Sequence, residues 1–273
     1  MGQFSVLHVQ YPEVTFLKKK LLKIYGERNT GTNYLGRLID LNLDVQQIPG
    51  VIPGWLSSVQ RWVHGKELAR DSYFSLTYSR NLGWKHSQVL PADEIRKLRI
   101  CANDLYFVTL TKNPYSWLLS MYRRPYHRYF SRKPDLGTFL TTPWEKVKRE
   151  NVAGEIPGPV ELWNIKNASY IQLQRKLPVL NLAFEKLLEN PEEVLCQIGK
   201  QFHLEWKVDG FVNYDQSAKR FHLEDESKGT QFYRDYYLNE KWKSDLSPSL
   251  ISIINERLDD DVMNYFGYER LVA

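Results

Sequence analysis

The chain has 273 residues, a formal net charge of +5 and an aromatic content of 14%. This length suits one large α/β domain, and we expect residues 1–273 to form a single domain. No apolar run approaches the ~20 residues that a transmembrane helix needs, and the start of the chain lacks the charged and apolar regions of a signal peptide. These features predict a cytoplasmic protein with no membrane span. The positive charge suits an anionic ligand without identifying it.

The first informative segment is a glycine-containing loop between an apolar strand pattern and a helical pattern. Gly26 and Gly31 have the G-x-x-x-x-G spacing of phosphate loops, which direct backbone N–H groups and a helix N-terminus toward an anion. A nucleoside-triphosphate loop would continue with Lys and then Ser or Thr, whereas Thr32 and Asn33 follow Gly31 here. The loop therefore indicates a site for a phosphate-like group without metal-assisted triphosphate chemistry. The alternative is an ordinary glycine-containing turn.

A second segment of the same kind lies further along the chain. Residues 105–111 are rich in β-branched and aromatic side chains, which is typical of a buried strand. Lys112, Asn113 and Pro114 follow it directly, and Ser120 lies eight residues beyond Lys112 in a helical pattern. This order resembles the 3′-phosphate site of sulfotransferases that use 3′-phosphoadenosine 5′-phosphosulfate (PAPS). Lys112 stands where that family usually has Arg.

Other segments resemble the same family, in the same order. Residues 84–86 (Trp-Lys-His), with Val-Leu-Pro at 89–91, are similar to the segment that carries the family's catalytic histidine. Residues 180–191 are similar to the family's next strand and helix start, and residues 227–230 are similar to a late loop that wraps the 3′-phosphate. Together these segments extend the resemblance over nearly the whole chain.

The resemblance implies a PAPS-dependent sulfotransferase with a P-loop-like nucleotide-binding fold. Its product would be 3′-phosphoadenosine 5′-phosphate (PAP), and no metal is implied. Backbone N–H groups of the glycine loop would hold the phosphosulfate, Tyr34 would stack on adenine, and Phe184 stands at a tyrosine position of the family. The residues expected to bind the cofactor are Arg28, Asn29, Thr30, Gly31, Thr32, Asn33, Tyr34, Lys112, Ser120, Phe184, Lys228, Gly229 and Thr230.

Arg28, Lys85 and His86 are the residues expected to take part in the chemistry. The family has a Lys where this chain has Asn29, so Arg28, one position earlier, is the candidate for stabilising the bridging oxygen. Lys85 could share or replace that role. His86 is the candidate general base, because an imidazole can accept the proton of an acceptor hydroxyl.

Two other residues compete with His86 for the role of the base. His64 lies in a segment without family resemblance, and some branches of the family use a glutamate, which points to Glu27. A carboxylate at Glu27 would repel an anionic cofactor. Glu27 is therefore expected to orient Arg28 or another basic side chain.

Strand and helix patterns alternate along the chain, which predicts a three-layer α/β fold: a parallel sheet with helices on both faces. Ligands of such folds bind at the carboxyl ends of the strands, where both phosphate motifs begin. The segment that follows residue 43 and holds Trp55 and Trp62 is expected to be irregular, and one last helix is expected from Ser247 through Val262. The predicted strands are 21–25, 105–111 and 179–184, and the other predicted helices are 31–43, 114–122, 159–176 and one beginning at Asn190-Pro191.

Three remaining features bear on partners and ligands. The basic and aromatic run at 123–133 could bind single-stranded nucleic acid, a nucleotide or an acidic acceptor, or form a solvated face. No nucleic-acid partner is predicted from it. No His, Cys, Asp or Glu residues have metal-ligand spacing, so no metal is predicted. Cys101 and Cys196 are expected to be buried thiols rather than a disulfide.

Three functions remain open at this level. The leading hypothesis is a sulfotransferase that moves the sulfuryl group of PAPS to a hydroxyl or amine of a small-molecule or saccharide acceptor. The second is a phosphotransferase (kinase) of the P-loop type, and the third is a noncatalytic protein that binds nucleotides or polyanions. The oligomeric state and the identity of the acceptor do not follow from the sequence.

Overall fold

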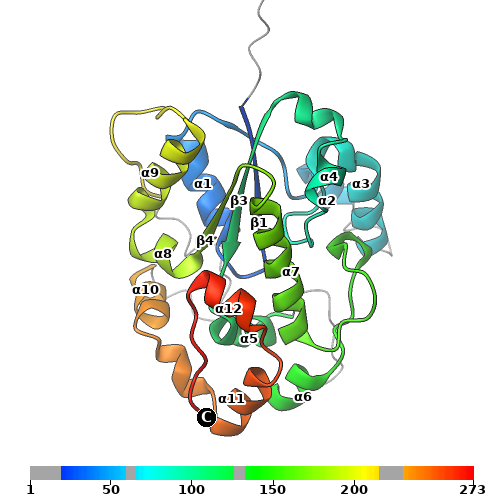
Figure 1. Ribbon diagram of the computed structural model, residues 1–273, viewed down its shortest axis with the longest axis vertical. Coiled ribbons are helices and arrows are strands. Elements are labelled where there is room, and N and C mark those ends of the chain that lie inside the picture. The colour runs from blue at the N-terminus through cyan, green and yellow to red at the C-terminus, as the bar shows by residue number, and fades with distance from the viewer. Residues whose placement is uncertain (1–19, 60–65, 126–132, 215–229) are drawn as a thin grey trace, which may run out of the picture.

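The computed structural model describes residues 20–59, 66–125, 133–214 and 230–273. Its centre is a four-stranded sheet in the order β2-β1-β3-β4, in which all neighbouring strands are parallel (Figure 1). In the register of the sheet, Ile24 pairs with Val108 and Val108 pairs with Leu180. The strands are β1 (Lys20–Gly26), β2 (Gln46–Gln47), β3 (Asp104–Thr111) and β4 (Val179–Ala183).

Helices connect the strands and continue after the last one. The elements before β4 are α1 (Thr32–Asn42), α2 (Gly54–Val59), α3 (Lys66–Asn81), α4 (Ala92–Ile95), η1 (Arg99–Ala102), α5 (Pro114–Arg123), α6 (Leu136–Thr141), η2 (Lys148–Glu150) and α7 (Pro159–Gln174). Those after β4 are α8 (Phe184–Glu189), α9 (Pro191–Phe202), α10 (Thr230–Leu238), η4 (Lys241–Asp245), α11 (Pro248–Asn255) and α12 (Asp260–Phe266).

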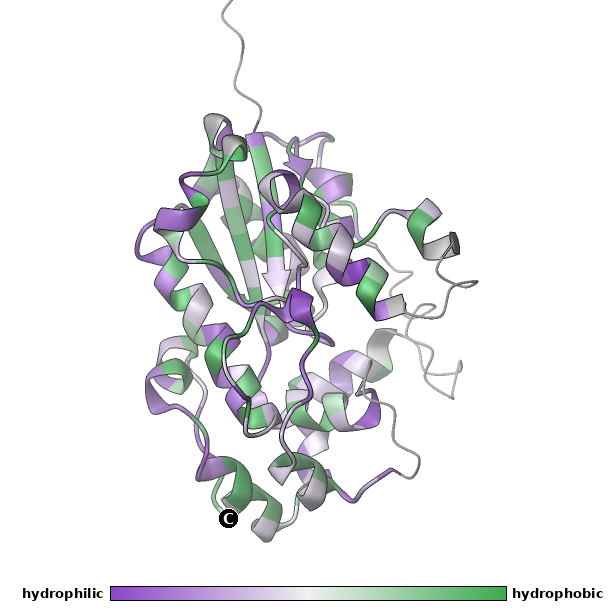
Figure 2. Cartoon of the chain, turned by 90° about the vertical axis from the view of Figure 1, so that its right-hand side faces the viewer, coloured by the Kyte–Doolittle hydropathy of each residue, from purple (hydrophilic) through white to green (hydrophobic). Residues whose placement is uncertain are grey.

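The sheet separates two hydrophobic clusters because side chains alternate between the two faces of a strand. Leu22 and Ile24 of β1 belong to the cluster that includes α1 and α9. Tyr25 and Phe107 belong to the cluster on the other face, which includes Tyr170 of α7. The strands are accordingly coloured mostly as hydrophobic in Figure 2. The predicted α/β class, with a parallel sheet between two helical layers, is confirmed.

A third hydrophobic cluster lies beyond the carboxyl end of β3. It includes Trp117 of α5, Trp163 of α7 and Trp242 of η4, together with side chains of α11 and α12. Figure 1 shows α5, α11 and α12 gathered at this end of the molecule. This cluster supports the helices that surround the ends of the strands.

Several sequence-based expectations were wrong in detail. The segment after residue 43 is not irregular throughout, since its described residues form β2, α2 and the 16-residue helix α3. The last predicted helix is two helices, because the Asp259 side chain accepts the Val262 N–H at 3.1 Å and so starts α12 after a break. Cys101 and Cys196 are free thiols, but Cys101 is only partly buried and Cys196 is exposed.

Candidate functional site

The loop after β1 has a backbone conformation that its sequence explains. Asn29 has φ 63° and Gly31 has φ 82°, and these are left-handed values that Asn and Gly adopt at the lowest cost. A Cβ atom at Gly31 would also lie 2.9 Å from the Phe184 ring. Gly31 is the N-cap residue of α1, and no side chain caps this helix. The loop therefore ends at the N-terminus of an 11-residue helix, which favours an anion.

A turn held by β1 places the predicted base beside this loop. Lys23 is fully buried, and its ammonium group donates to the carbonyls of Pro49 (3.1 Å), Asn81 (2.5 Å) and Gly83 (2.7 Å). The Tyr25 hydroxyl donates to the Leu82 carbonyl at 2.5 Å. Two residues of one strand thus fix the turn that immediately precedes the segment 84–86.

His86 lies at the carboxyl end of β1. The Gly26 N–H donates to the Lys85 carbonyl at 2.9 Å, and His86 Nδ1 lies 2.5 Å from the Gly26 carbonyl. A carbonyl can only accept, so Nδ1 carries the hydrogen and Nε2 of the neutral ring is left with a lone pair. Burial, with the positive charges of Lys85 and Arg28, lowers the pKa of His86 well below its usual value. The neutral imidazole can therefore act as a proton acceptor near pH 7.

Arg28 approaches the same segment from the loop. Its guanidinium carbon lies 4.6 Å from the centroid of the Trp84 ring, and its carbonyl accepts the Trp117 indole N–H at 2.9 Å. Arg149 lies at the same distance from the Trp84 ring and pairs with acidic side chains of α3. Trp84 thus holds two guanidinium groups near the loop and His86.

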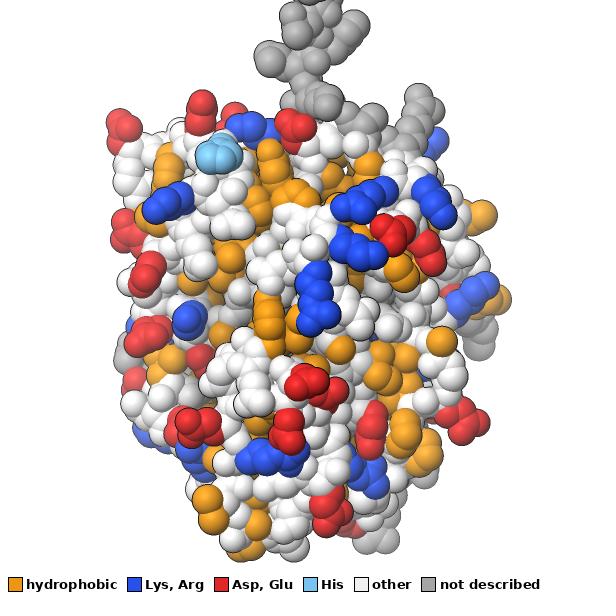
Figure 3. Space-filling model, viewed as in Figure 1, with side chains coloured by type: hydrophobic (Ala, Val, Ile, Leu, Met, Phe, Trp, Pro, Cys, Tyr) orange, Lys and Arg blue, Asp and Glu red, His pale blue; other side chains and the backbone are white. Residues whose placement is uncertain are grey.

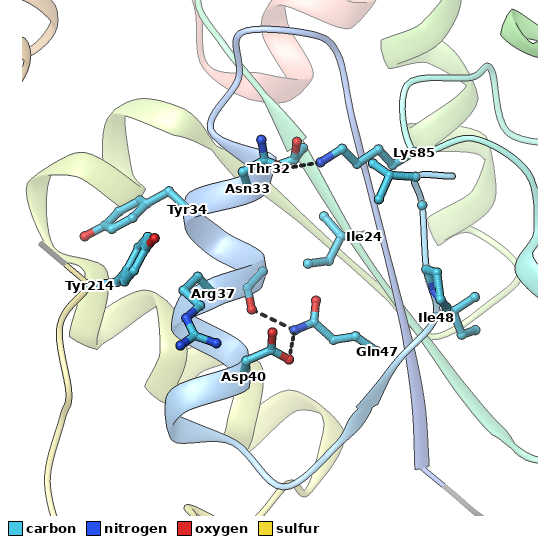
Figure 4. Close-up of a pocket in the computed structure, with 14 residues that line it drawn as sticks. Ile24, Thr32, Asn33, Tyr34, Arg37, Asp40, Gln47, Ile48, Lys85 and Tyr214 are labelled. Atoms are coloured by element: carbon cyan, nitrogen blue, oxygen red, sulfur yellow. Dashed lines mark hydrogen bonds between the residues drawn. The ribbon is translucent and has the colours of Figure 1, made fainter. Parts of the chain in front are cut away.

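Lys85 faces the N-terminus of α1. Its ammonium group donates to Asn33 Oδ1 at 2.5 Å, and burial lowers its pKa to about 8. Within the described part of the chain, no carboxylate forms an ion pair with it. Figure 4 shows Lys85 and Asn33 at one end of a pocket of about 520 Å³ along α1, with Tyr34 and Tyr214 across the helix. The Tyr34 hydroxyl donates to Asn213 Oδ1 at 3.0 Å.

Lys112 and Ser120 meet at the carboxyl end of β3, as their spacing predicted. Asn113 caps α5 by accepting the Tyr115 N–H at 3.1 Å, and this fixes the start of the helix that carries Ser120. Lys112 Nζ donates to Ser120 Oγ at 3.0 Å, and the Lys112 side chain is only 1% exposed. Burial lowers the pKa of Lys112.

Aromatic rings, rather than acidic side chains, surround the Lys112 ammonium group. Its nitrogen lies 3.7 Å from the centroid of the Tyr237 ring and 4.9 Å from that of Phe184. The Glu185 carboxylate instead accepts the Asn113 N–H and the Tyr268 hydroxyl. Among residues that the structure describes, Lys112 has no carboxylate partner.

Tyr237 is a member of this site that the sequence motifs did not identify. Its hydroxyl lies 3.3 Å from Ser120 Oγ, and its ring meets Phe184 edge to face at 5.3 Å. Burial raises the pKa of Tyr237, but the charges of Lys112 and Arg123, together with hydrogen bonds to Ser120 and Lys112, lower it overall. The only sequence signal was that Tyr237 follows the late loop expected to contact the 3′-phosphate.

Glu27 is directed into the protein. Its Oε1 lies 2.6 Å from Lys166 Nζ, which also pairs with Glu150 at 3.2 Å. Burial raises the pKa of Glu27, and its Oε2 is buried without a hydrogen-bond partner in the described structure. The basic partner expected for Glu27 is therefore Lys166, and this pairing favours His86 over Glu27 as the base.

The remaining residues that the sequence predicted to bind the cofactor lie in the glycine loop, at helix starts or outside the described residues. The Thr30 hydroxyl donates to the Glu27 carbonyl at 2.5 Å, so it stabilises the loop in this structure, and the Thr32 side chain is buried at the start of α1. Thr230 is the first residue of α10. Lys228, Gly229, His64 and the greater part of the basic run (126–132) lie outside the described residues.

Two further observations concern ligands and surfaces. In the described ranges, no helix is long and apolar enough to cross a membrane, and no three His, Cys, Asp or Glu side chains are grouped to hold a metal ion. Basic and acidic side chains are intermixed on the face shown in Figure 3, although the net charge is positive.

Comparison with known proteins found similarity at the level of solved structures. No protein-family model and no curated protein matches the chain. A sulfotransferase domain from the curacin biosynthetic pathway is 14% identical, with a TM-score of 0.44 over 93% of this chain and 99% of that one. The mouse sulfotransferase SULT7A1 complexed with PAP is 12% identical, with a TM-score of 0.44 over 92% and 89%. A sulfotransferase from Alicyclobacillus acidocaldarius is 14% identical, with a TM-score of 0.40 over 90% and 99%. These structures are sulfotransferases, the family that the sequence motifs resemble.

Proposed function

We propose that this protein is a PAPS-dependent sulfotransferase. The observation that carries the proposal is the Lys112–Ser120 pair, a buried ammonium group without a carboxylate partner among the described residues. Burying an unpaired charge is costly, so a buried cation of this kind indicates a site completed by an anionic ligand. A phosphate group, with several oxygens that accept hydrogen bonds, suits the donors present.

A second anion site lies next to the first. The loop at 27–31 ends at the uncapped N-terminus of α1, where Lys85 adds a positive charge. One aromatic ring separates the two sites, because Phe184 packs against Gly31 and also lies 4.9 Å from Lys112. A nucleotide with anionic groups at both its 5′ and 3′ positions would contact both sites. PAPS has this charge distribution, whereas ATP carries all its phosphates on one side.

The residues near the loop suit the chemistry of sulfuryl transfer. Bound PAPS would supply the sulfuryl group that an acceptor hydroxyl or amine receives. His86 Nε2 would accept the acceptor's proton, since Nδ1 is held by the Gly26 carbonyl. Backbone N–H groups of the loop, together with Arg28 and Lys85, would stabilise the charge on the leaving phosphate. We propose a small-molecule or saccharide acceptor.

Ligand binding separates this proposal from the two other functions. Melting of the protein is measured with PAP, with adenosine 5′-monophosphate (AMP), with ATP and Mg²⁺, and with heparin. A ligand at a hundredfold excess over its Kd stabilises by about 2.7 kcal/mol. We expect stabilisation by PAP, a weaker effect of AMP, and loss of the PAP effect in Lys112→Ala. Stabilisation by ATP–Mg²⁺ would instead indicate a phosphotransferase, and stabilisation by heparin alone a polyanion-binding protein.

Activity is tested separately from binding. Transfer of radiolabel from PAPS is screened against phenols, alcohols, sugars and amines, and the His86→Ala variant serves as the inactive control. PAP binding without transfer to any acceptor, in a protein that retains all the residues above, would favour a noncatalytic nucleotide-binding role.

A further inference from the structure

Helix α10 is fixed over the Lys112 site from two sides. Arg234 donates to the backbone carbonyls of Leu188 and Glu189 at the end of α8. Arg123, in the last turn of α5, donates to the Tyr236 hydroxyl at 2.8 Å. Because α5 carries Ser120 and α8 begins at Phe184, these contacts tie α10 to both walls of the site.

The next residue of α10, Tyr237, faces the site itself. Its ring lies against the Lys112 ammonium group, with 3.7 Å between the nitrogen and the ring centroid. Its hydroxyl lies 3.3 Å from Ser120 Oγ, which also accepts from Lys112 at 3.0 Å. The two adjacent tyrosines therefore contact different groups. Tyr236 binds Arg123 and so helps to fix α10, whereas Tyr237 contacts Lys112 and Ser120, the proposed anion-binding pair.

The other hydrogen bonds of Ser120 make the Tyr237 hydroxyl a donor in this site. Ser120 has one hydroxyl hydrogen, which it donates to the Ser116 carbonyl at 2.9 Å. In the contact between the two hydroxyls, Tyr237 therefore donates and Ser120 accepts. Lys112 donates to the same oxygen. Two donors converge on one serine oxygen, and phosphate oxygens are acceptors to which both donors can turn.

We propose that the Tyr237 hydroxyl is a ligand of the 3′-phosphate, beside Lys112 and Ser120, and that it contributes to selection of a 3′-phosphorylated adenosine nucleotide. The inference rests on the proposed function, because it assigns a further residue to the same cofactor site. Removal of the hydroxyl should remove one hydrogen bond to a doubly charged group and leave the packing of the ring on Lys112 intact.

The experiment compares two phenylalanine variants of adjacent tyrosines. Affinities for PAP and AMP are measured by calorimetry for the wild type, Tyr237→Phe and Tyr236→Phe. We expect Tyr237→Phe to bind PAP about tenfold more weakly or worse, with AMP affinity unchanged, since only PAP carries the 3′-phosphate. Tyr236→Phe should retain the PAP affinity of the wild type within about twofold. Its hydroxyl does not contact Lys112 or Ser120, and α10 keeps its attachment through Arg234, while Arg123 keeps its ion pair with Asp245.

The outcomes distinguish this inference from the proposed function. A wild type that prefers PAP and a Tyr237→Phe variant that keeps the full preference would overturn the inference alone. Equal losses of PAP and AMP affinity in Tyr237→Phe would also overturn it, because the hydroxyl would then not act at the 3′-phosphate. Equal wild-type affinities for PAP and AMP would overturn the proposed cofactor and this inference together.

Discussion

Four lysine side chains are buried in the described structure. The protein itself supplies several acceptors or acidic partners for two of them, and it supplies fewer for the other two. Lys23 donates to three backbone carbonyls, and Lys166 pairs with Glu27 and Glu150. Lys112 hydrogen-bonds to the Ser120 and Tyr237 hydroxyls, and Lys85 donates to Asn33. Neither lysine forms an ion pair with a described carboxylate. Lys23 joins β1 to the turn before Trp84, and Lys166 joins α7 to Glu27 and Glu150. Lys112 lies at the carboxyl end of β3, and Lys85 lies beside Gly26 at that of β1.

On the proposed function, this difference separates lysines that stabilise the fold from lysines that bind the anionic ligand. A buried ammonium group is tolerated when its hydrogen bonds and charge are matched within the protein. Where they are not matched, the folded protein is less stable than it could be, and an anion gains affinity by completing the site. The following predictions test whether the two sets of lysines differ in this way, and whether His86 acts as the base.

The largest effect is expected at His86. An asparagine side chain at this position can still donate its amide N–H to the Gly26 carbonyl but offers no basic nitrogen, so His86→Asn should keep the fold and lose the base. We expect kcat to fall by ~10²–10⁴-fold, with PAP affinity and melting temperature nearly unchanged. Sulfate-transfer kinetics with labelled PAPS, together with melting and PAP titration, measure these quantities. Near-normal kcat in the folded variant would exclude His86 as the base.

The same substitution should destabilise the protein at a lysine with a carboxylate partner and not at a lysine without one. Lys166→Met leaves two buried carboxyl groups without their cation and should lower the free energy of unfolding by about 3–5 kcal/mol. Lys112→Met replaces an unpaired buried cation with an apolar chain of similar length and should cause no loss of stability. Urea unfolding of both variants and the wild type provides the comparison. Similar destabilisation by the two substitutions would remove the distinction between the two sets of lysines.

The smallest effect is expected from pH. Because burial lowers the pKa of Lys85 to about 8, this side chain loses its positive charge as pH rises through that value. PAP affinity should then fall between pH 7 and pH 9.5 by roughly fivefold, which corresponds to about 1 kcal/mol. The Lys85→Arg variant keeps its positive charge throughout, so its PAP affinity should change less over the same range. Parallel pH profiles for the two proteins would show that Lys85 does not contact the anion.

The fold was largely predictable because its signals are local. Asn113, Asn190 and Ser247 each precede a proline, and each caps the helix that the sequence placed after it. Runs of apolar and β-branched residues likewise marked β1, β3 and β4 within one or two residues. The break before Asp259 was missed because apolar residues at i, i+4 spacing continue across it, and the apolar pattern outweighed a single capping aspartate.

The candidate site was predictable only where its residues belong to one segment. Lys112 and Ser120 are eight residues apart on one strand–helix unit, so their meeting follows from local geometry. Lys166 lies 139 residues from Glu27, and Tyr237 lies 117 residues from Ser120. These pairs depend on how α7 packs against the sheet and how α10 packs against α8 and η4. A single sequence carries no spacing rule for such contacts.

The attachment of the turn at 81–83 to β1 also bears on how the protein could vary. Lys23, Tyr25 and Gly26 bind this turn and the residues after it directly, so the backbone of one strand sets the position of His86 relative to the loop. The long segment between α1 and the turn also contributes two contacts. The Pro49 carbonyl accepts from Lys23, and the Gly50 carbonyl accepts the Lys85 N–H. The end of α3 takes part in this arrangement through the Asn81 carbonyl, whereas none of these contacts involves α2. Helix α2 could therefore be exchanged for another segment, and a new acceptor-binding surface tried there, without displacing the proposed base.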